Sequence, residues 1–269
     1  TNFECMIDQR EKISALIITY NEMGYIEKCI DSIAFADEII VVDSYSTDGT
    51  YEYLNNHPKV RVIQHEFENY TAQKSFALKQ ASHDWVLFLD ADEVVTDKLR
   101  KEIKCKAKKD SEHCAYWFYR KFMFKNSRLR FSGWQTDKNY RLFRKSKAQF
   151  SKEKIVHETL IVKGSTGILK QKLMHYCYKN YEDYRYKMLK YGRLKAKEAH
   201  QKEKKFNYLL LIFKPIWKFF NHYIIRLGIL DGKKGITICY LNALGDFERY
   251  RELQRLGKKE KMAYFLVES

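Results

Sequence analysis

Trp85-Val86-Leu87-Phe88-Leu89-Asp90-Ala91-Asp92-Glu93 is the stretch that decides the fold, because an apolar run ends there in three carboxylates. A β-strand buried on both faces reads as a continuous apolar run, and open α/β sheets bind ligands at the carboxyl ends of such strands. Asp90 and Asp92 are therefore predicted at the rim of a parallel sheet. Alternate residues share a face of an extended strand, so both carboxylates can point toward one Mg²⁺ or Mn²⁺ ion. A solvated acidic turn after a core strand is the alternative.

Upstream of this stretch the sequence repeats a pattern of strand followed by helix. Apolar runs at 13–18, 39–42 and 60–63 predict further strands. Isoleucines at helical spacing after Asn21, with Asn21 as the N-cap, and the stretch 71–80 predict helices between them. Strands that alternate with helices at this spacing imply βαβ units and a parallel sheet.

The chain changes character after this region. Residues 116–124 and 140–143 are rich in aromatic and β-forming residues, with a turn at 125–127. We therefore assign 1–175 to one catalytic domain that ends in mixed sheet and loops. Residues 176–269 are assigned to a basic, aromatic and helical C-terminal extension, which opens with a charged, Tyr-rich helix.

The segment 206–230 is strongly apolar but carries basic residues. Lys214, Lys218 and Arg226 interrupt it, and such charges are costly at the centre of a bilayer, so a membrane-spanning helix is disfavoured. Basic residues together with Trp and Phe on a broken helix are typical of a segment that lies in the membrane interface. A pair of core helices packed on the first domain has the same apolar periodicity and is the alternative.

Composition indicates an anionic partner and a reducing compartment. The 269 residues include 50 Lys and Arg against 34 Asp and Glu, a formal net charge of +16, which suits nucleic acid, a phosphorylated small molecule or an anionic membrane surface. The six cysteines form no CxxC pair and are read as reduced thiols of a cytoplasmic protein. The start of the chain shows no apolar core of a secretory signal peptide.

Two other functions compete with a metal-dependent transferase. A basic nucleic-acid-binding protein would explain the charge, but the acidic strand ends would repel a phosphate backbone in the absence of a metal. A sugar-phosphate nucleotidyltransferase would use the same carboxylates, but the glycine-rich phosphate loop expected near its start is absent from this sequence.

Three motifs in order carry a resemblance to a known family. Thr19-Tyr20-Asn21-Glu22, Val41 to Thr50 (VVDSYSTDGT) and Leu89-Asp90-Ala91-Asp92-Glu93 resemble the nucleotide-sugar half of family 2 glycosyltransferases. Later motifs resemble the branch that includes bacterial lipopolysaccharide core glucosyltransferases: YRLFR at 140–144, Val156-His157-Glu158, and LDGKKG at 230–235. The resemblance implies an α/β fold of the GT-A type, Rossmann-like and built for nucleotide-diphospho-sugars, with a UDP-sugar donor, a divalent metal and inversion at the anomeric carbon.

The same resemblance assigns roles to residues that also have physical reasons for them. The donor nucleotide is assigned to Thr19, Tyr20, Glu22, Asp43, Lys74, Asp90 and Arg141, and the metal, Mg²⁺ or Mn²⁺, to Asp92 and His157. Asp43 can accept a hydrogen bond from uracil N3–H, although a turn-capping aspartate is its alternative. Arg141 and Arg144 are three residues apart on a strand and are expected to point apart, so that one reaches the donor.

An inverting transfer also requires a base. Glu158 is the first candidate to take the proton of the acceptor hydroxyl, and Asp137 is the second. The resulting hypothesis is transfer of a hexose from a UDP-sugar to a lipopolysaccharide-core or other lipid-linked saccharide, with glucose favoured by the resemblance alone. The protein is expected to lie peripherally at the cytoplasmic face of the bacterial inner membrane, bound to its anionic surface, and not to bind nucleic acid.

Overall fold

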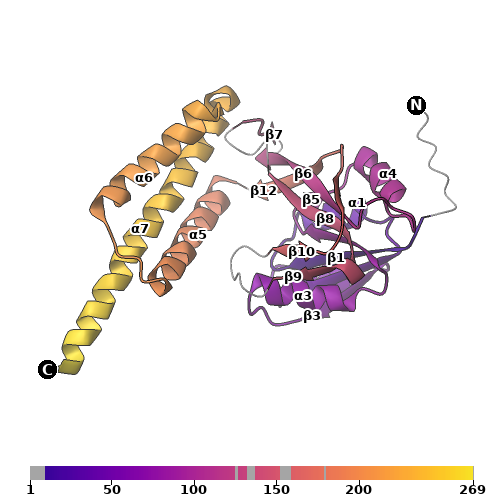
Figure 1. Ribbon diagram of the computed structural model, residues 1–269, viewed down its shortest axis with the longest axis horizontal. Helices are drawn as coiled ribbons and strands as arrows, with labels where there is room; N and C mark the ends of the chain where they lie inside the picture. Colours follow the sequence, from indigo (N-terminus) through magenta and orange to yellow (C-terminus); the bar gives the residue numbers. More distant parts are fainter. Residues whose placement is uncertain (1–9, 125–126, 132–136, 152–158, 179, 269) are drawn as a thin grey trace. The chain divides into compact units, whose positions relative to one another are not determined.

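The apolar runs of the first half form the parallel strands of one sheet, as the sequence predicts (Figure 1). These strands are β1 (Ile13–Thr19), β2 (Glu38–Asp43), β3 (Val60–Gln64) and β4 (Trp85–Asp90), in the order β3-β2-β1-β4. Nearly every side chain of β1, β2 and β4 is buried, which explains why these three strands read as unbroken apolar runs.

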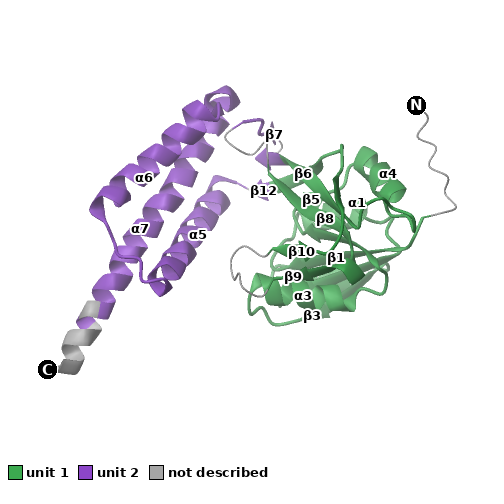
Figure 2. Ribbon diagram, in the orientation of Figure 1, with its two compact units in different colours: residues 1–121, 136–176 green, residues 122–135, 177–269 purple. Residues whose placement is uncertain are grey.

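The computed structural model describes residues 10–124, 127–131, 137–151, 159–178 and 180–268. The chain divides into two compact units, shown in green and purple in Figure 2. Unit 1 comprises Thr1–Lys121 and Thr136–Tyr176, and unit 2 comprises Phe122–Gln135 and Cys177–Ser269.

Helices cover both faces of the parallel strands in unit 1. Alternate strand residues belong to two separate apolar clusters, because successive side chains point to opposite faces. One cluster contains residues of α1 (Ile26–Ser32), α2 (Thr50–Asn55) and α4 (Asp97–Lys106), and the other contains residues of α3 (Tyr70–Gln80). This layered α/β arrangement is the predicted Rossmann-like fold class.

One detail of the first helix is wrong in the prediction. Asn21 does not cap α1, because that helix begins five residues later, at Ile26. Asn21 instead adopts a left-handed backbone with φ of 55°, and its Oδ1 accepts a hydrogen bond from the Thr47 N–H at 2.8 Å. The residue therefore joins the loop after β1 to the loop after β2.

Antiparallel strands extend the sheet on the far side of β4. Strand β8 (Lys138–Arg144) pairs with β4, and β6 (Ala115–Phe124) pairs with β8. Strand β5 (Glu93–Val94) pairs with β12 (Leu173–Tyr178), which sets His175 opposite Glu93. The remaining strands are short: β7 (Ser127–Arg128), β9 (Ala148–Phe150), β10 (Leu160–Val162) and β11 (Thr166–Ile168).

Unit 2 is mainly helical. Its helices are α5 (Tyr181–Gln201), α6 (Tyr208–Phe220) and α7 (Gly232–Glu268), with the π-helical turn η3 (Asn221–Ile225) and the 3-10 turn η4 (Gly228–Asp231) between α6 and α7. Helices α5 and α7 cross closely at Gly192, where an added Cβ would lie 2.5 Å from the carbonyl oxygen of Gly245. Among the residues that the structure describes, no helix is both long and apolar enough to cross a membrane.

The partly buried carboxylate of Glu38 joins β1, β2 and the loop between α3 and β4. Glu38, at the start of β2, accepts hydrogen bonds from Ser14 Oγ at 2.6 Å and from Ser82 N–H and Oγ at 2.9 and 2.8 Å. Burial by itself raises the pKa of Glu38, but these hydrogen bonds outweigh it and lower the pKa below its ordinary value. Ionised Glu38 therefore stabilises the fold at neutral pH.

We predict that Glu38→Gln lowers the free energy of unfolding by about 1–2 kcal/mol at pH 7, because a charged acceptor of three hydrogen bonds is lost. The folded-state pKa lies below the unfolded one, so this stabilisation is present above about pH 4.3 and is lost as the pH falls further. Urea denaturation at neutral and acidic pH measures the difference. Glu66→Gln, at an exposed loop position, is the control. A deficit that grows toward acidic pH would contradict the role given to the ionised carboxylate.

Candidate functional site

The carboxyl ends of three neighbouring strands bring the predicted donor residues to one edge of unit 1. Thr19 ends β1 and lies opposite Asp43 at the end of β2. Asp90 ends β4 and lies opposite Ile18 on the other side of β1. The parallel register therefore places these three polar groups along one rim, where ligands of open α/β sheets bind.

Two loops after β1 and β2 are fastened to each other at this rim. The backbone N–H groups of Asn21, Glu22 and Met23 donate to Ser46 Oγ at 2.9 Å, Thr50 Oγ1 at 3.0 Å and Asp48 Oδ2 at 3.1 Å. Tyr20 projects from this region with 58% of its surface exposed. The loops hold Tyr20 at a fixed place while leaving it available to a ligand.

The Asp43 side chain is fully buried and forms hydrogen bonds within its own loop. Its carboxylate accepts hydrogen bonds from the Ser46 N–H at 3.0 Å and from Ser46 Oγ. This is the turn-capping role that the sequence leaves open beside uracil recognition. Thr19 Oγ1, in contrast, is buried and has no hydrogen-bond partner within the described part of the chain. A buried polar atom of this kind usually has a partner that the protein alone does not supply.

Asp90 lies among cations. Arg141 of β8 is ion-paired with it, Lys74 Nζ of α3 lies 3.5 Å from its Oδ1, and Arg120 of β6 lies 4.0 Å from its Oδ2. Burial by itself raises the pKa of Asp90, but these three cations outweigh it and hold the pKa far below its usual range. Asp90 is therefore an anion at any physiological pH.

Glu93 is the second anchor of the same cations, and it was missed as a site residue. Its fully buried carboxylate lies 2.6 Å from Arg141 Nη2 and 3.4 Å from Arg120 Nη1, and it accepts the Asp90 N–H at 3.0 Å. Burial lowers the pKa of Arg141, but Asp90 and Glu93 outweigh it and raise the pKa above its ordinary value. The only sequence signal for Glu93 is its place in the acidic run, and none marks Arg120.

The second carboxylate of the acidic run has a different neighbour. Asp92 Oδ2 lies 3.2 Å from His175 Nε2, on the strand that pairs with β5. The predicted metal ligand His157 and the predicted base Glu158 lie outside the described residues. His175 was missed, because only the pairing of β5 with β12 brings it to Asp92.

This pair fits a divalent cation in part. One carboxylate and one imidazole are donors that Mn²⁺ accepts, and both side chains are largely buried. No group of three or more His, Cys, Asp or Glu residues suited to a metal occurs in the described ranges. A cation here would therefore take most of its ligands from substrate phosphates and water, as Mg²⁺ does in nucleotide sites.

Of the remaining predicted residues, Arg141 and Asp137 join the acidic cluster, and Arg144 lies apart from it. Arg141 points to the acidic cluster, whereas Arg144 pairs with Glu11 at 2.9 Å and lies over the ring of Trp85, so the two arginines point apart as expected. Asp137, the second candidate base, pairs with Arg120, whose Nε lies 2.6 Å from Asp137 Oδ2. Asp137 is thus joined to the Asp90 and Glu93 cluster through Arg120.

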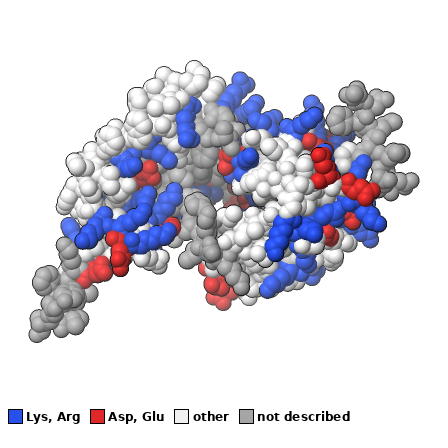
Figure 3. Space-filling view, viewed as in Figure 1, with Lys and Arg blue, Asp and Glu red and all other residues white. Residues whose placement is uncertain are grey.

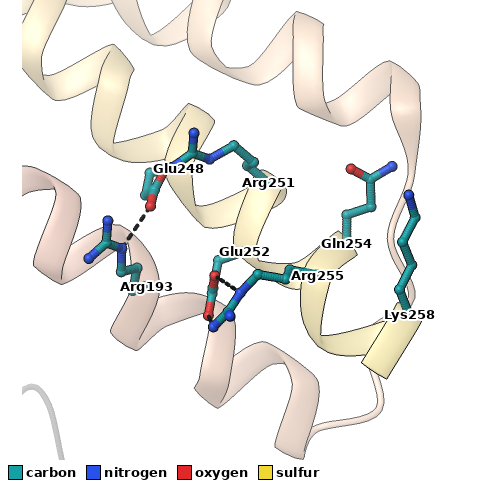
Figure 4. Close-up of a pocket in the computed structure, with 7 residues that line it drawn as sticks. All are labelled: Arg193, Glu248, Arg251, Glu252, Gln254, Arg255 and Lys258. Carbon is teal, nitrogen blue, oxygen red and sulfur yellow. Dashed lines mark hydrogen bonds and ion pairs between the residues drawn. The ribbon is translucent and has the colours of Figure 1, made fainter. Parts of the chain in front are cut away.

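Unit 2 contains a separate polar pocket with a volume of about 570 Å³. Figure 4 shows its lining residues, which are Arg193, Glu248, Arg251, Glu252, Gln254, Arg255 and Lys258. Acidic and basic side chains of this pocket pair with one another. Arg193 Nε lies 2.7 Å from Glu248 Oε1, and Arg255 Nη2 lies 2.7 Å from Glu252 Oε1. We therefore assign the chemistry to the strand-end cluster of unit 1.

The cluster lies within a region that matches a known family. The family model of glycosyl transferase family 2 matches residues 14–176, more than half of the chain and every residue of the strand-end cluster. The chain belongs to glycosyl transferase family 2. Membership decides between the alternatives read from the sequence in favour of a glycosyltransferase, and the predicted GT-A fold class is confirmed with it.

Several proteins are similar to this family 2 chain over most of its length. The lipopolysaccharide core biosynthesis glycosyltransferase LpsC of Rhizobium meliloti is 29% identical, over 88% of this chain and 93% of that protein. An uncharacterized glycosyltransferase of Rickettsia conorii is 30% identical, over 93% of each chain. Among solved structures, S. aureus TarS in complex with UDP covers 93% of this chain and 92% of that one, at 19% identity and a TM-score of 0.45. The predicted resemblance to lipopolysaccharide core enzymes of the family is confirmed.

We predict that Glu93→Gln lowers the free energy of unfolding by roughly 3 kcal/mol, because the buried Arg141 and the partly buried Arg120 lose a compensating charge. The matched experiment is a double-mutant cycle with Arg141→Gln, measured by urea denaturation. The double variant should lose clearly less than the sum of the single losses, since it removes both members of the pair. Additive losses would show that Glu93 and Arg141 are not energetically coupled.

Proposed function

We propose that this family 2 glycosyltransferase moves a hexose from a UDP-sugar to a lipopolysaccharide-core or other lipid-linked saccharide, with inversion at the anomeric carbon. The observation that carries the proposal is the strand-end pair Asp90 and Asp92, set among Lys74, Arg141 and His175 within the family region. The similarity to LpsC supports the acceptor class.

The donor nucleotide would lie along the rim formed by β1, β2 and β4. The buried hydroxyl of Thr19 has no hydrogen-bond partner among the described residues, and Tyr20 and Glu22 lie on the loop that would border the uridine. Asp43 would present its remaining acceptor capacity to uracil N3–H, beside the hydrogen bonds that it accepts from Ser46 and Gln64. Lys74 and Arg141 would meet the diphosphate, because they are the cations nearest Asp90.

Charge balance supports a divalent cation at Asp92 and His175. The cluster contains four carboxylates, of Asp90, Asp92, Glu93 and Asp137, and three cations, of Lys74, Arg120 and Arg141. The carboxylates therefore outnumber the Lys and Arg side chains by four to three, and a diphosphate would add further negative charge. A Mg²⁺ or Mn²⁺ ion held there would offset this negative charge and would stabilise the charge that develops on the departing UDP.

The transfer itself requires little covalent chemistry from the protein. The acceptor oxygen forms a bond to the anomeric carbon while the bond from that carbon to the phosphate oxygen breaks, and UDP leaves with the electron pair. The hydroxyl proton passes to a carboxylate on the side opposite UDP. Glu158 remains the first candidate for this base and Asp137 the second. Because Arg120 holds Asp137, the acceptor would have to bind beside that ion pair for Asp137 to serve.

The proposed acceptor class also implies where in the cell the enzyme works. A lipid-linked saccharide made with a cytoplasmic UDP-sugar requires the enzyme at the cytoplasmic face of the bacterial inner membrane, where it would be bound peripherally.

The proposed reaction is tested by its products. We expect release of UDP from one of UDP-glucose, UDP-galactose or UDP-N-acetylglucosamine when Mn²⁺ and a detergent-solubilised lipopolysaccharide-core acceptor are present. NMR of the product should show inverted anomeric configuration. Turnover with GDP-mannose alone would contradict the UDP assignment, and retained configuration would remove the single-displacement mechanism.

We predict that Asp92→Asn reduces turnover by at least about a hundredfold, because the carboxylate that would hold the cation is lost. His175→Ala should weaken Mn²⁺ binding by about ten- to a hundredfold. Titration of Mn²⁺ followed by electron paramagnetic resonance, with UDP present, measures binding apart from turnover. Asp97→Asn, at an exposed position in α4, is the matched control. Unchanged Mn²⁺ affinity in both site variants would remove the metal role of this pair.

A further inference from the structure

Helix α6 presents its apolar stripe to solvent. Positions separated by three or four residues form one face of a helix, and such an apolar face normally packs on a core. Here that face is 46–76% exposed at each position, and it consists of Leu209, Ile212, Phe213, Ile216, Trp217 and Phe220. We call these six residues the α6 face. No residue of α6, all of which the structure describes, is buried.

The exposed apolar surface continues beyond α6 within unit 2. Ile224, Ile225, Leu227, Ile229 and Leu230, in η3 and η4 and around them, are 43–62% exposed. Figure 3 shows the region over α6 as an area of largely uncharged residues with Lys and Arg atoms nearby. Single exposed apolar residues are ordinary, but a contiguous group of this size marks a surface that binds a partner.

The opposite side of α6 already has its own partner. Phe219 lies with Tyr181, Ile236 and Tyr240 around a small hollow of unit 2, and α6 packs along α7. Helix α6 is therefore packed on the rest of unit 2, and its α6 face is exposed in spite of that packing. Among the described residues of unit 2, α7 covers one side of α6 and the α6 face stays exposed.

Charge selects the class of partner. Unit 2 contains 24 Lys and Arg against 10 Asp and Glu, whereas unit 1 contains 26 against 24, so almost all of the net charge of +16 belongs to unit 2. Residues 204–234 contain seven Lys and Arg and one acidic residue, Asp231. That carboxylate accepts the N–H groups of Arg130 and Phe131 at 3.0 and 2.9 Å, so it is already engaged. An anionic surface complements this segment, whereas a second copy of the chain would place like charges together.

The dimensions of α6 favour a position in the plane of a bilayer. Its 13 residues extend about 20 Å, shorter than the roughly 30 Å hydrocarbon core. Lys214 and Lys218 lie within the helix, and such charges are costly in the hydrocarbon core, which disfavours insertion along the helix axis. Trp217 belongs to the residue types that prefer the boundary between headgroups and acyl chains.

We propose that the α6 face, with η3 and η4, inserts into the surface of an anionic phospholipid bilayer. The proposal deepens the proposed function, since it supplies the membrane contact that a lipid-linked acceptor requires. Its test needs neither donor nor acceptor, so it can fail while the glycosyltransferase proposal stands, and the reverse also holds.

Flotation of the full chain with lipid vesicles tests the proposal. Wild-type protein should float with vesicles of phosphatidylcholine mixed with phosphatidylglycerol, and added salt should weaken this binding without abolishing it. The double variant Ile212→Glu/Ile216→Glu should reduce the floated fraction by at least about tenfold, because both side chains belong to the inserted face. Both positions are 62% exposed, so the fold should tolerate the changes. Ile168→Glu, at a 50% exposed position of unit 1, is the control and should float like wild type.

Two outcomes would overturn the proposal. Equal flotation of wild type and the double variant would show that the α6 face does not insert. Sedimentation of wild type as a dimer without lipid, with the double variant monomeric, would assign the face to a second copy of the chain. Transfer to a detergent-solubilised acceptor should be the same for wild type and the double variant, which separates membrane binding from catalysis.

Discussion

The strand-end site depends on one buried ionic contact, between Glu93 and Arg141. A carboxylate without solvent access costs several kcal/mol to desolvate unless a cation and hydrogen bonds compensate it. Arg141 supplies that compensation from β8, and Arg120 adds to it from β6. Burial of Glu93 in the acidic run therefore depends on the arginines that the antiparallel strands β6 and β8 supply beside the parallel strands.

The same contact determines what the rim presents to a ligand. Arg141 bridges Glu93 and Asp90, so Asp90 is held as an anion at a fixed place beside Lys74. Asp92, two residues on, is turned toward His175 by the pairing of β5 with β12. The two aspartates of the run thus contact different partners. Asp90 contacts Lys74 and Arg141, and Asp92 contacts the imidazole of His175. In the proposed reaction this separation would allow Asp90 to order the cations around the diphosphate while Asp92 and His175 serve the metal.

The parts of this arrangement that sequence predicts are those set by local pattern. Strands β1, β2 and β4 are buried on both faces, and their parallel order brings Thr19, Asp43 and Asp90 together without further information. The divergence of Arg141 and Arg144 follows from strand alternation. Glu93, Arg120 and His175 could not be recognised in the same way, because their roles arise from pairings between distant segments. Asn21 shows a local limit as well, since its left-handed backbone serves a contact to Thr47 and not a helix cap.

Periodicity alone left two possibilities for 206–230, a core helix pair and an interfacial segment, because both have the same apolar pattern. A helix needs an apolar stripe to pack on a protein core and an equivalent stripe to enter a membrane surface. Accessible surface adds information within unit 2, where the stripe of α6 is exposed while another side of the helix packs on α7. The distribution of charge between the two units is a further difference that apolar periodicity does not show. Unit 1 has nearly balanced charge, and the cations of its site are paired with carboxylates. Unit 2 has a large excess of positive charge beside an apolar surface. The excess charge of the chain therefore lies mainly in unit 2, beside the surface proposed to enter a bilayer, whereas the candidate catalytic site would obtain its positive charge locally from Lys74, Arg120, Arg141 and a bound cation.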